Sequence, residues 1–334
     1  KWIQLLKQLD FNSSLKLLDH LETHDLQIYC DEEVYQSCMY AQWKTGEPWH
    51  VKSLMARMKD RGLLVGSNEY AYLVSSYLNH KDSKQALLIL DQMESENITL
   101  GKELYDDVIR VCEDGCEAEV IADRMRKNYI PVDNDTHLAL FEVYCRSRES
   151  EEAFETFNKL VDAKFPIDAG LCEKLCEVSD ITMKFQNLLE CYSTMVDKEP
   201  KITPTNEIYR IAFKAAVNLD RYDDAYNILE HRFVTINKPP APRMVEVTLL
   251  GLNNANQYET AIKMYDSCVK REVDLSFNSL RAVVSAYEHT DQVDKAIDLW
   301  RDMKDKGIIQ DSQTYHDTLE DLLARMYSRS LQVE

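Results

Sequence analysis

Glycine, proline and basic residues are scarce in this sequence. Its 334 residues include only eight glycines and eight prolines. Sheets joined by tight turns use many of both, so this composition favours long helices. Lysine and arginine total 39 against 58 aspartates and glutamates, which gives a formal net charge of -19. A chain this acidic has no general surface for polyanions, although basic protein partners or one small basic groove remain open.

Several sequence signals are also absent. No run of about eighteen apolar residues occurs, so no membrane-spanning segment is predicted. No secretory signal peptide is visible. The first residues, Lys1 to Ile3, read as the middle of a helix, and we expect natural sequence with any targeting segment to precede them. A glycine-rich phosphate loop, a nucleophile elbow and a zinc-deaminase signature are missing, so the sequence predicts no enzyme, no cofactor and no small-molecule substrate.

Nine cysteines are spread along the chain without the spacing of a metal site. Cys112 and Cys116, like Cys172 and Cys176, lie four residues apart, which is one helical turn and not the two-residue gap of a zinc knuckle. No histidine pair completes either set. The odd number and the lack of clustering indicate reduced thiols packed in a helical core, and no metal site is predicted.

The clearest pattern lies in residues 277–311, which read as two helices with a polar turn between them. The first helix is expected from about Leu280 to His289, and the second begins near Val293. Gly307 is expected to end the second helix, because glycine adopts the left-handed conformation readily. One hairpin of this size cannot bury its own apolar face, so it needs neighbours of the same kind.

The same pattern recurs along nearly the whole chain with a period of about 35 residues. Its register is marked by a small residue early in each second helix: Ala86, Ala118, Ala153, Ala225, Ala261 and Ala296. We expect a small residue where the two helices of a hairpin cross most closely. The sequence therefore predicts a single all-α solenoid of about nine hairpins, without a second domain. Its parts are a partial repeat at 1–31, repeats at 32–66, 67–101, 102–133, 134–168, 169–205, 206–241, 242–276 and 277–311, and a terminal helix at 312–334.

The repeat resembles the pentatricopeptide repeat family. In the last unit the resemblance is carried by Val293-Asp294-Lys295-Ala296, Leu299-Trp300, Met303-Lys304, Lys306-Gly307-Ile308 and the terminal Asp311. Good copies occur at Met58-Lys59-Asp60-Arg61-Gly62-Leu63 and at the endings Asp133 and Asp168. The tetratricopeptide repeat is the close alternative, but its Trp-Leu-Gly-Tyr signature is absent here. The resemblance implies a right-handed superhelical arrangement of helix-turn-helix repeats.

Members of this family work on RNA in mitochondria and chloroplasts, or serve as structural subunits of organellar ribosomes and polymerases. The resemblance thus implies an organellar location and leaves three functions open. The first is a non-enzymatic scaffold, a protein-bound subunit of a large ribonucleoprotein, ribosomal or transcription complex. The second is a sequence-selective factor that binds single-stranded RNA for its stability, processing or translation. The third is an adaptor that binds peptides, as tetratricopeptide repeats do.

In the family, the fifth residue of the first helix and the last residue of the repeat together select a base. The expected Thr, Ser or Asn is missing from the fifth positions, which hold Gln36, Ala71, Leu138, Glu173, Arg210, Glu246 and Arg281. Last positions match in part, with Asp133, Asp168 and Asp311. The second position, usually aliphatic, holds polar residues such as Arg243 and Asn278. These departures weaken the expectation of base-by-base reading and favour protein docking.

Basic residues cluster on the late first helices. The candidate RNA-binding residues are Arg210, Lys214, Arg243, Asn278, Arg281 and Asp311. Stacked repeats place equivalent positions side by side, so these cations could contact consecutive phosphates along one groove. The alternative is that they pair with the abundant neighbouring acids.

Overall fold

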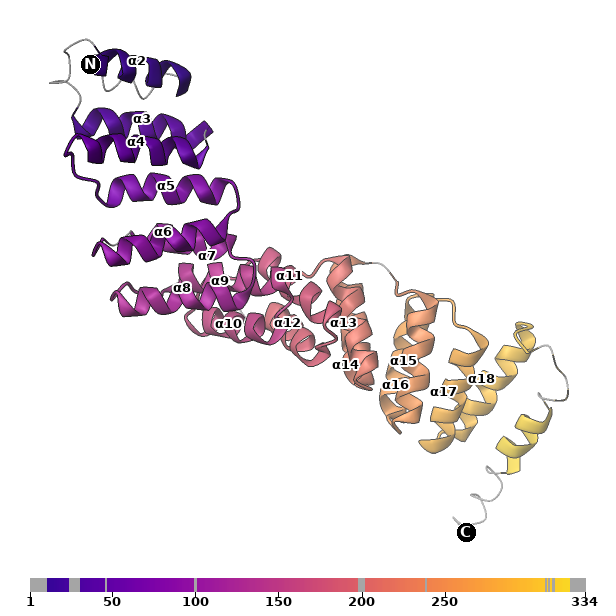
Figure 1. The fold of residues 1–334 in the computed structure, drawn as a ribbon. Coiled ribbons are helices and arrows are strands. Elements are labelled where there is room, and N and C mark those ends of the chain that lie inside the picture. Colours follow the sequence, from indigo (N-terminus) through magenta and orange to yellow (C-terminus); the bar gives the residue numbers. More distant parts are fainter. Residues whose placement is uncertain are drawn as a thin grey trace. The chain divides into compact units, whose positions relative to one another are not determined.

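The computed structural model consists of paired helices that follow one another along the chain (Figure 1). The structure describes residues 11–23, 31–45, 47–98, 101–197, 202–237, 239–309, 311, 313 and 316–324. No strand occurs among these residues, and the all-α prediction is confirmed. The chain divides into two compact units, Lys1–Ile167 and Asp168–Glu334. A single unbroken array across both units stays a prediction.

Each hairpin consists of a first helix, called the A helix, and a second, called the B helix. In the first unit the A helices are α3 (Glu32–Thr45), α5 (Ser67–Asn79), α7 (Lys102–Val111) and α9 (Asn134–Ser147). The B helices are α2 (Phe11–Thr23), α4 (Pro48–Asp60), α6 (Ser83–Ser95), α8 (Gly115–Lys127) and α10 (Ser150–Asp162). The predicted helix over residues 2–9 lies outside the described residues.

In the second unit the A helices are α11 (Ala169–Ile181), α13 (Asn206–Asn218), α15 (Pro242–Asn254) and α17 (Phe277–His289). The B helices are α12 (Phe185–Asp197), α14 (Tyr222–Ile236), α16 (Tyr258–Lys270) and α18 (Val293–Asp305). Residues 316–324 are helical as well, with Leu322 buried, whereas the predicted ends of that helix at Tyr315 and Met326 lie outside the described residues.

The small residues that mark the repeat in the sequence lie in the core of the structure. The six marker alanines of the B helices are all completely buried. Each described A helix packs against its own B helix, and each A helix from α5 to α9 and from α13 to α17 also packs against the B helix before it, within its unit. Trp300, at the centre of the last hairpin, is 1% exposed, and burial of a side chain this large contributes roughly 1.5–3 kcal/mol.

Most A helices begin where a short polar side chain or a glycine ends the preceding repeat; α15, which follows Ala241 and begins with Pro242, is an exception. Asp133 accepts hydrogen bonds from the backbone N–H groups of Asp135 (3.1 Å) and Thr136 (3.3 Å). Asp168 accepts one from Leu171 (2.8 Å), as Ser276 does from Ser279 (3.2 Å) in the last repeat. Such caps satisfy backbone donors that the first helical turn leaves unpaired. The Ser276 cap explains why α17 begins at Phe277, three residues before the predicted Leu280.

A residue in the left-handed conformation follows each B helix whose end the structure describes, namely α4, α6, α8, α10, α14, α16 and α18. Gly62 and Gly307 adopt it at φ +74° and +68°, so the expected role of Gly307 is confirmed. The same place in other repeats holds residues with side chains, including Tyr129 at φ 56° and Lys164 at φ 56°. The left-handed conformation costs a residue with a side chain about 1–2 kcal/mol. These repeats therefore carry local backbone strain that glycine would remove.

We predict that Tyr129→Gly stabilises the first unit. The Tyr129 side chain is 96% exposed, so its removal costs no packing. Relief of the left-handed strain should exceed the extra unfolded-state entropy of glycine and raise the free energy of unfolding by about 0.5–1 kcal/mol. Urea unfolding followed by circular dichroism measures this change. Gly307→Ala is the matched control and should lower stability; a Tyr129→Gly protein no more stable than the parent would contradict this account.

Candidate nucleic-acid interface

The six residues predicted to contact RNA all lie in the second unit and are all exposed. Arg210 and Lys214 lie on α13, Arg243 on α15, and Asn278 and Arg281 on α17. Helices α15 and α17 pack against each other. Asp311 follows α18 and accepts a hydrogen bond from the backbone N–H of Gln313 (3.2 Å).

Glu246 of α15 forms hydrogen bonds with polar side chains at the start of α17. Its Oε1 accepts a hydrogen bond from Asn278 Nδ2 (2.9 Å), and its Oε2 accepts one from Ser276 Oγ (2.9 Å). Glu246 is the fifth residue of its repeat, Ser276 is the last, and Asn278 is the second of the next repeat. The structure thus brings the two positions that the resemblance links to one base, the fifth and the last, together with the second position of the next repeat.

The electrostatics around Glu246 follow from these contacts. The hydrogen bonds from Asn278 and then Ser276, together with the nearby positive charge of Arg243, lower the pKa of Glu246 below its ordinary value. Glu246 therefore stays ionised at neutral pH. Arg243 lies nearly one helical turn before Glu246 on α15, and Arg281 lies nearly one turn after Asn278 on α17. The guanidinium of Arg243 therefore lies near the Glu246 carboxylate, whereas Arg281 lies further along the adjoining helix.

The two cations of α13 are already paired with acids. Arg210 Nε donates to Glu207 Oε2 (3.0 Å), and its Nη2 contacts the other oxygen of the same carboxylate. Lys214 Nζ lies 2.7 Å from Asp180 Oδ1 of the preceding A helix. At these two positions the structure has the acid pairing that the sequence left as an alternative.

The two arginines of α15 and α17 differ from those of α13. Neither Arg243 nor Arg281 makes a hydrogen bond or ion pair with any residue that the structure describes, and both side chains are exposed. The predicted basic cluster therefore separates into a neutralised pair on α13 and an available pair on α15 and α17. An available guanidinium can grip a phosphate through two parallel hydrogen bonds.

A buried ion network in the first unit was not anticipated from the sequence. Lys102 Nζ lies 3.0 Å from both Asp106 Oδ2 and Asp133 Oδ1, and Asp106 is 3% exposed. Thr136 Oγ1 donates to Asp106 Oδ1 (2.7 Å). Burial raises the pKa of Asp133, but its bonds with Lys102 and the α9 backbone outweigh this and lower it. The signal was the spacing of Lys102 and Asp106, one turn apart at a helix start. Asp133, a last position of the family pattern, is thus held as a structural anchor.

The described part of the chain contains no metal site and no helix that could span a membrane. No group of three or more His, Cys, Asp or Glu side chains there could hold a metal ion. No described helix is long and apolar enough to span a membrane. The eight described cysteines form no disulfide; six are buried as expected, whereas Cys145 is half-buried and Cys116 is exposed on α8. Cys30 lies outside the described residues.

Comparison with family models gives two matches. A model described as "Pentatricopeptide repeat-containing protein" matches residues 44–160, and one described as "PPR repeat" matches residues 279–308. A search of curated proteins gives no match.

Comparison with solved structures gives a match in fold. The crystal structure of the pentatricopeptide repeat protein PPR10 from maize is similar over 96% of this chain, at 14% identity and a TM-score of 0.50. This chain spans 56% of that protein's length. PPR10 in complex with an 18-nt psaJ RNA element is similar over 96% of this chain and 52% of that one, at 14% identity and a TM-score of 0.46. Nuclear proteinaceous RNase P 2 from A. thaliana is similar over 66% of this chain and 42% of that one, at 11% identity and a TM-score of 0.30.

We predict that Asn278→Ala raises the pKa of Glu246 toward its ordinary value, because the variant lacks the largest contribution to the shift. A carboxyl whose folded pKa is depressed stabilises the fold above its unfolded pKa, and this contribution is lost as pH falls through the folded pKa. Carboxyl carbon NMR titration of the intact chain measures the change. A Glu246 pKa that is the same in the parent and in Asn278→Ala would contradict the geometry.

Proposed function

The chain is a pentatricopeptide repeat protein, and from this premise we propose that it is a non-enzymatic scaffold of organellar gene expression that contacts single-stranded RNA through α15 and α17. The observation that carries the RNA contact is the pair of unpaired, exposed arginines, Arg243 and Arg281, on two helices that pack together. The organellar location, in mitochondria or plastids, rests on the family.

The chemistry around Glu246 suits a short RNA contact. Arg243 and Arg281 supply positive charge for phosphate oxygens, which positions a strand without selecting its sequence. The Glu246 carboxylate can accept a hydrogen bond from an exocyclic amino group of a base, and Asn278 already orients it from the neighbouring helix. Because Glu246 also repels phosphate, we expect the strand to place a base, and not its backbone, against this carboxylate.

The rest of the chain is assigned to protein docking. The net charge of -19 opposes extended contact with a polyanion, and the α13 cations are neutralised by Glu207 and Asp180. A repeat array offers a large surface on which protein subunits of a complex can assemble. In this proposal RNA contact is local, whereas most of the surface binds proteins, and the chain itself has no catalytic role.

We predict that Arg243→Gln combined with Arg281→Gln weakens RNA binding by about tenfold or more. Each lost phosphate contact should also reduce the slope of log affinity against log salt by roughly 0.7, hence by about 1.4 for two. Fluorescence anisotropy with an unstructured single-stranded RNA of about 20 nucleotides, titrated from about 50 mM salt, measures both quantities.

The matched control for this experiment is Arg210→Gln combined with Lys214→Gln. It removes the same charge from the neighbouring repeat, where both cations are already paired, and should change affinity by less than about twofold. An equal loss in both double variants would show a diffuse charge effect and reject the localised contact. No binding by the parent at about 50 mM salt would reject the RNA contact altogether.

A further inference from the structure

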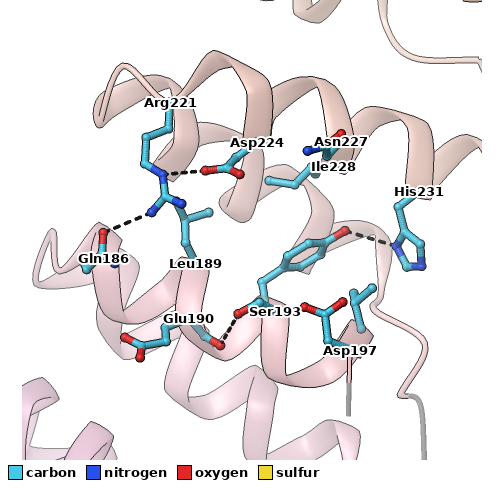
Figure 2. A pocket seen from close by; sticks show the side chains of 12 residues that line it. Gln186, Leu189, Glu190, Ser193, Asp197, Arg221, Asp224, Asn227, Ile228 and His231 are labelled. Atoms are coloured by element: carbon cyan, nitrogen blue, oxygen red, sulfur yellow. Dashed lines mark hydrogen bonds and ion pairs between the residues drawn. The ribbon is translucent and has the colours of Figure 1, made fainter. Parts of the chain in front are cut away.

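A cavity of about 610 Å³ lies between two consecutive B helices of the second unit, α12 and α14. Figure 2 shows Glu190, Ser193 and Asp197 on one wall and Asp224, Asn227 and His231 on the other. The RNA residues proposed above lie on A helices, so the cavity belongs to a different surface. Its volume is within the range of sites that bind a small molecule or a few side chains of a partner.

At three other places in the described part of the chain, an arginine bridges two consecutive B helices. Arg57 of α4 reaches Asp19 of α2 (2.6 Å), and Arg124 of α8 reaches Asp91 of α6 (2.6 Å). Arg271, directly after α16, donates two hydrogen bonds of 2.6 Å to the carboxylate of Glu230 on α14. In these three pairs a guanidinium of the later repeat therefore pairs with an acid of the earlier B helix.

Helices α12 and α14 lack this arginine. Arg124 stands six residues after the marker Ala118, and the residue six after the marker Ala225 is His231. The ring of His231 itself links α14 to the two preceding helices, because its Nδ1 is hydrogen-bonded to the hydroxyls of Tyr192 on α12 (3.1 Å) and Tyr209 on α13 (2.9 Å). Among the described residues, no ion pair joins α12 to α14. The acids of α12 that line the cavity therefore have no internal arginine of this kind as a partner.

The cavity carries excess negative charge. Three carboxylates line it, against one guanidinium, that of Arg221. Arg221 pairs with Asp224 (2.5 Å) and donates to Gln186 Oε1 of α12 (3.3 Å), as Figure 2 shows. The side chains of Glu190 and Asp197 make no hydrogen bond or ion pair with any described residue. They lie seven residues apart on α12, which places them two turns apart on the same face. Two acids at the rim are consequently available to a cation.

We propose that this cavity binds an arginine side chain in a basic segment of a protein partner. The partner's guanidinium would occupy the space that Arg57, Arg124 and Arg271 occupy between other B helices. Arginine suits it because the planar group can donate to two carboxylates at once. The rings of Tyr192 and His231 in the lining add surface on which a guanidinium can lie. The proposal rests on the docking role given above, names the chemistry of the partner, and is independent of the RNA contact.

The test uses the intact chain and a fluorescein-labelled, glycine-spaced peptide with two arginines, at about 150 mM salt to screen diffuse attraction. Glu190→Gln combined with Asp197→Asn should weaken binding by about tenfold or more. The matched control is Glu155→Gln combined with Asp162→Asn on α10, two exposed acids with the same spacing and no partner among the described residues. It should change affinity by less than about twofold. Equal loss in both variants would overturn the proposal.

Two further measurements separate the cavity from charge alone. Asn227→Trp fills the cavity without a change of charge and should also weaken binding, whereas unchanged affinity would place the peptide outside the cavity and overturn the proposal. A peptide with citrulline in place of arginine should not bind, and equal binding of this neutral analogue would likewise overturn it. Peptide binding should persist in the Arg243→Gln, Arg281→Gln variant, so failure of the RNA contact and failure of this site are distinguishable.

Discussion

The packing of each B helix against the next A helix is the interaction on which the rest of this structure depends. A lone hairpin leaves one apolar face in water, so each repeat is stable only against its neighbours. The fit is close: Gly251 of α15 faces the ring of Tyr222 at the start of α14, and a methyl group at Gly251 would collide with that ring. Stacking also brings Glu246 and Ser276 of one repeat together with Asn278 of the next.

Several residues that end a repeat stabilise the fold by capping the next helix. Asp133, Asp168 and Ser276 all cap the A helix that follows them, and Lys102 additionally holds Asp133 in an ion network. A capping carboxylate whose oxygens already accept hydrogen bonds has less capacity left for a base. Helix capping is thus sufficient to explain the match of these positions to the family pattern.

The sequence was sufficient for the fold because its signals are local and repeated. The marker alanines, Gly307 and the apolar spacing each reflect contacts within one hairpin or with the next. The acid with which each cation pairs was not predictable. Lys214, for example, pairs with Asp180, 34 residues earlier, and many other acids were equally near in sequence. The cavity between α12 and α14 was missed for the same reason: whether His231 contacts Tyr192 and Tyr209 or an acid of α12 depends on side-chain packing between repeats.

The central claim is that this acidic repeat protein contacts RNA only where its cations are left unpaired. Photo-crosslinking of the intact chain to a single-stranded RNA that carries 4-thiouridine, followed by mass spectrometry of the crosslinked peptides, tests it most directly. The account predicts crosslinks within residues 242–289, on α15 and α17. Crosslinks concentrated on the A helices of the first unit, α3 to α9, would contradict it.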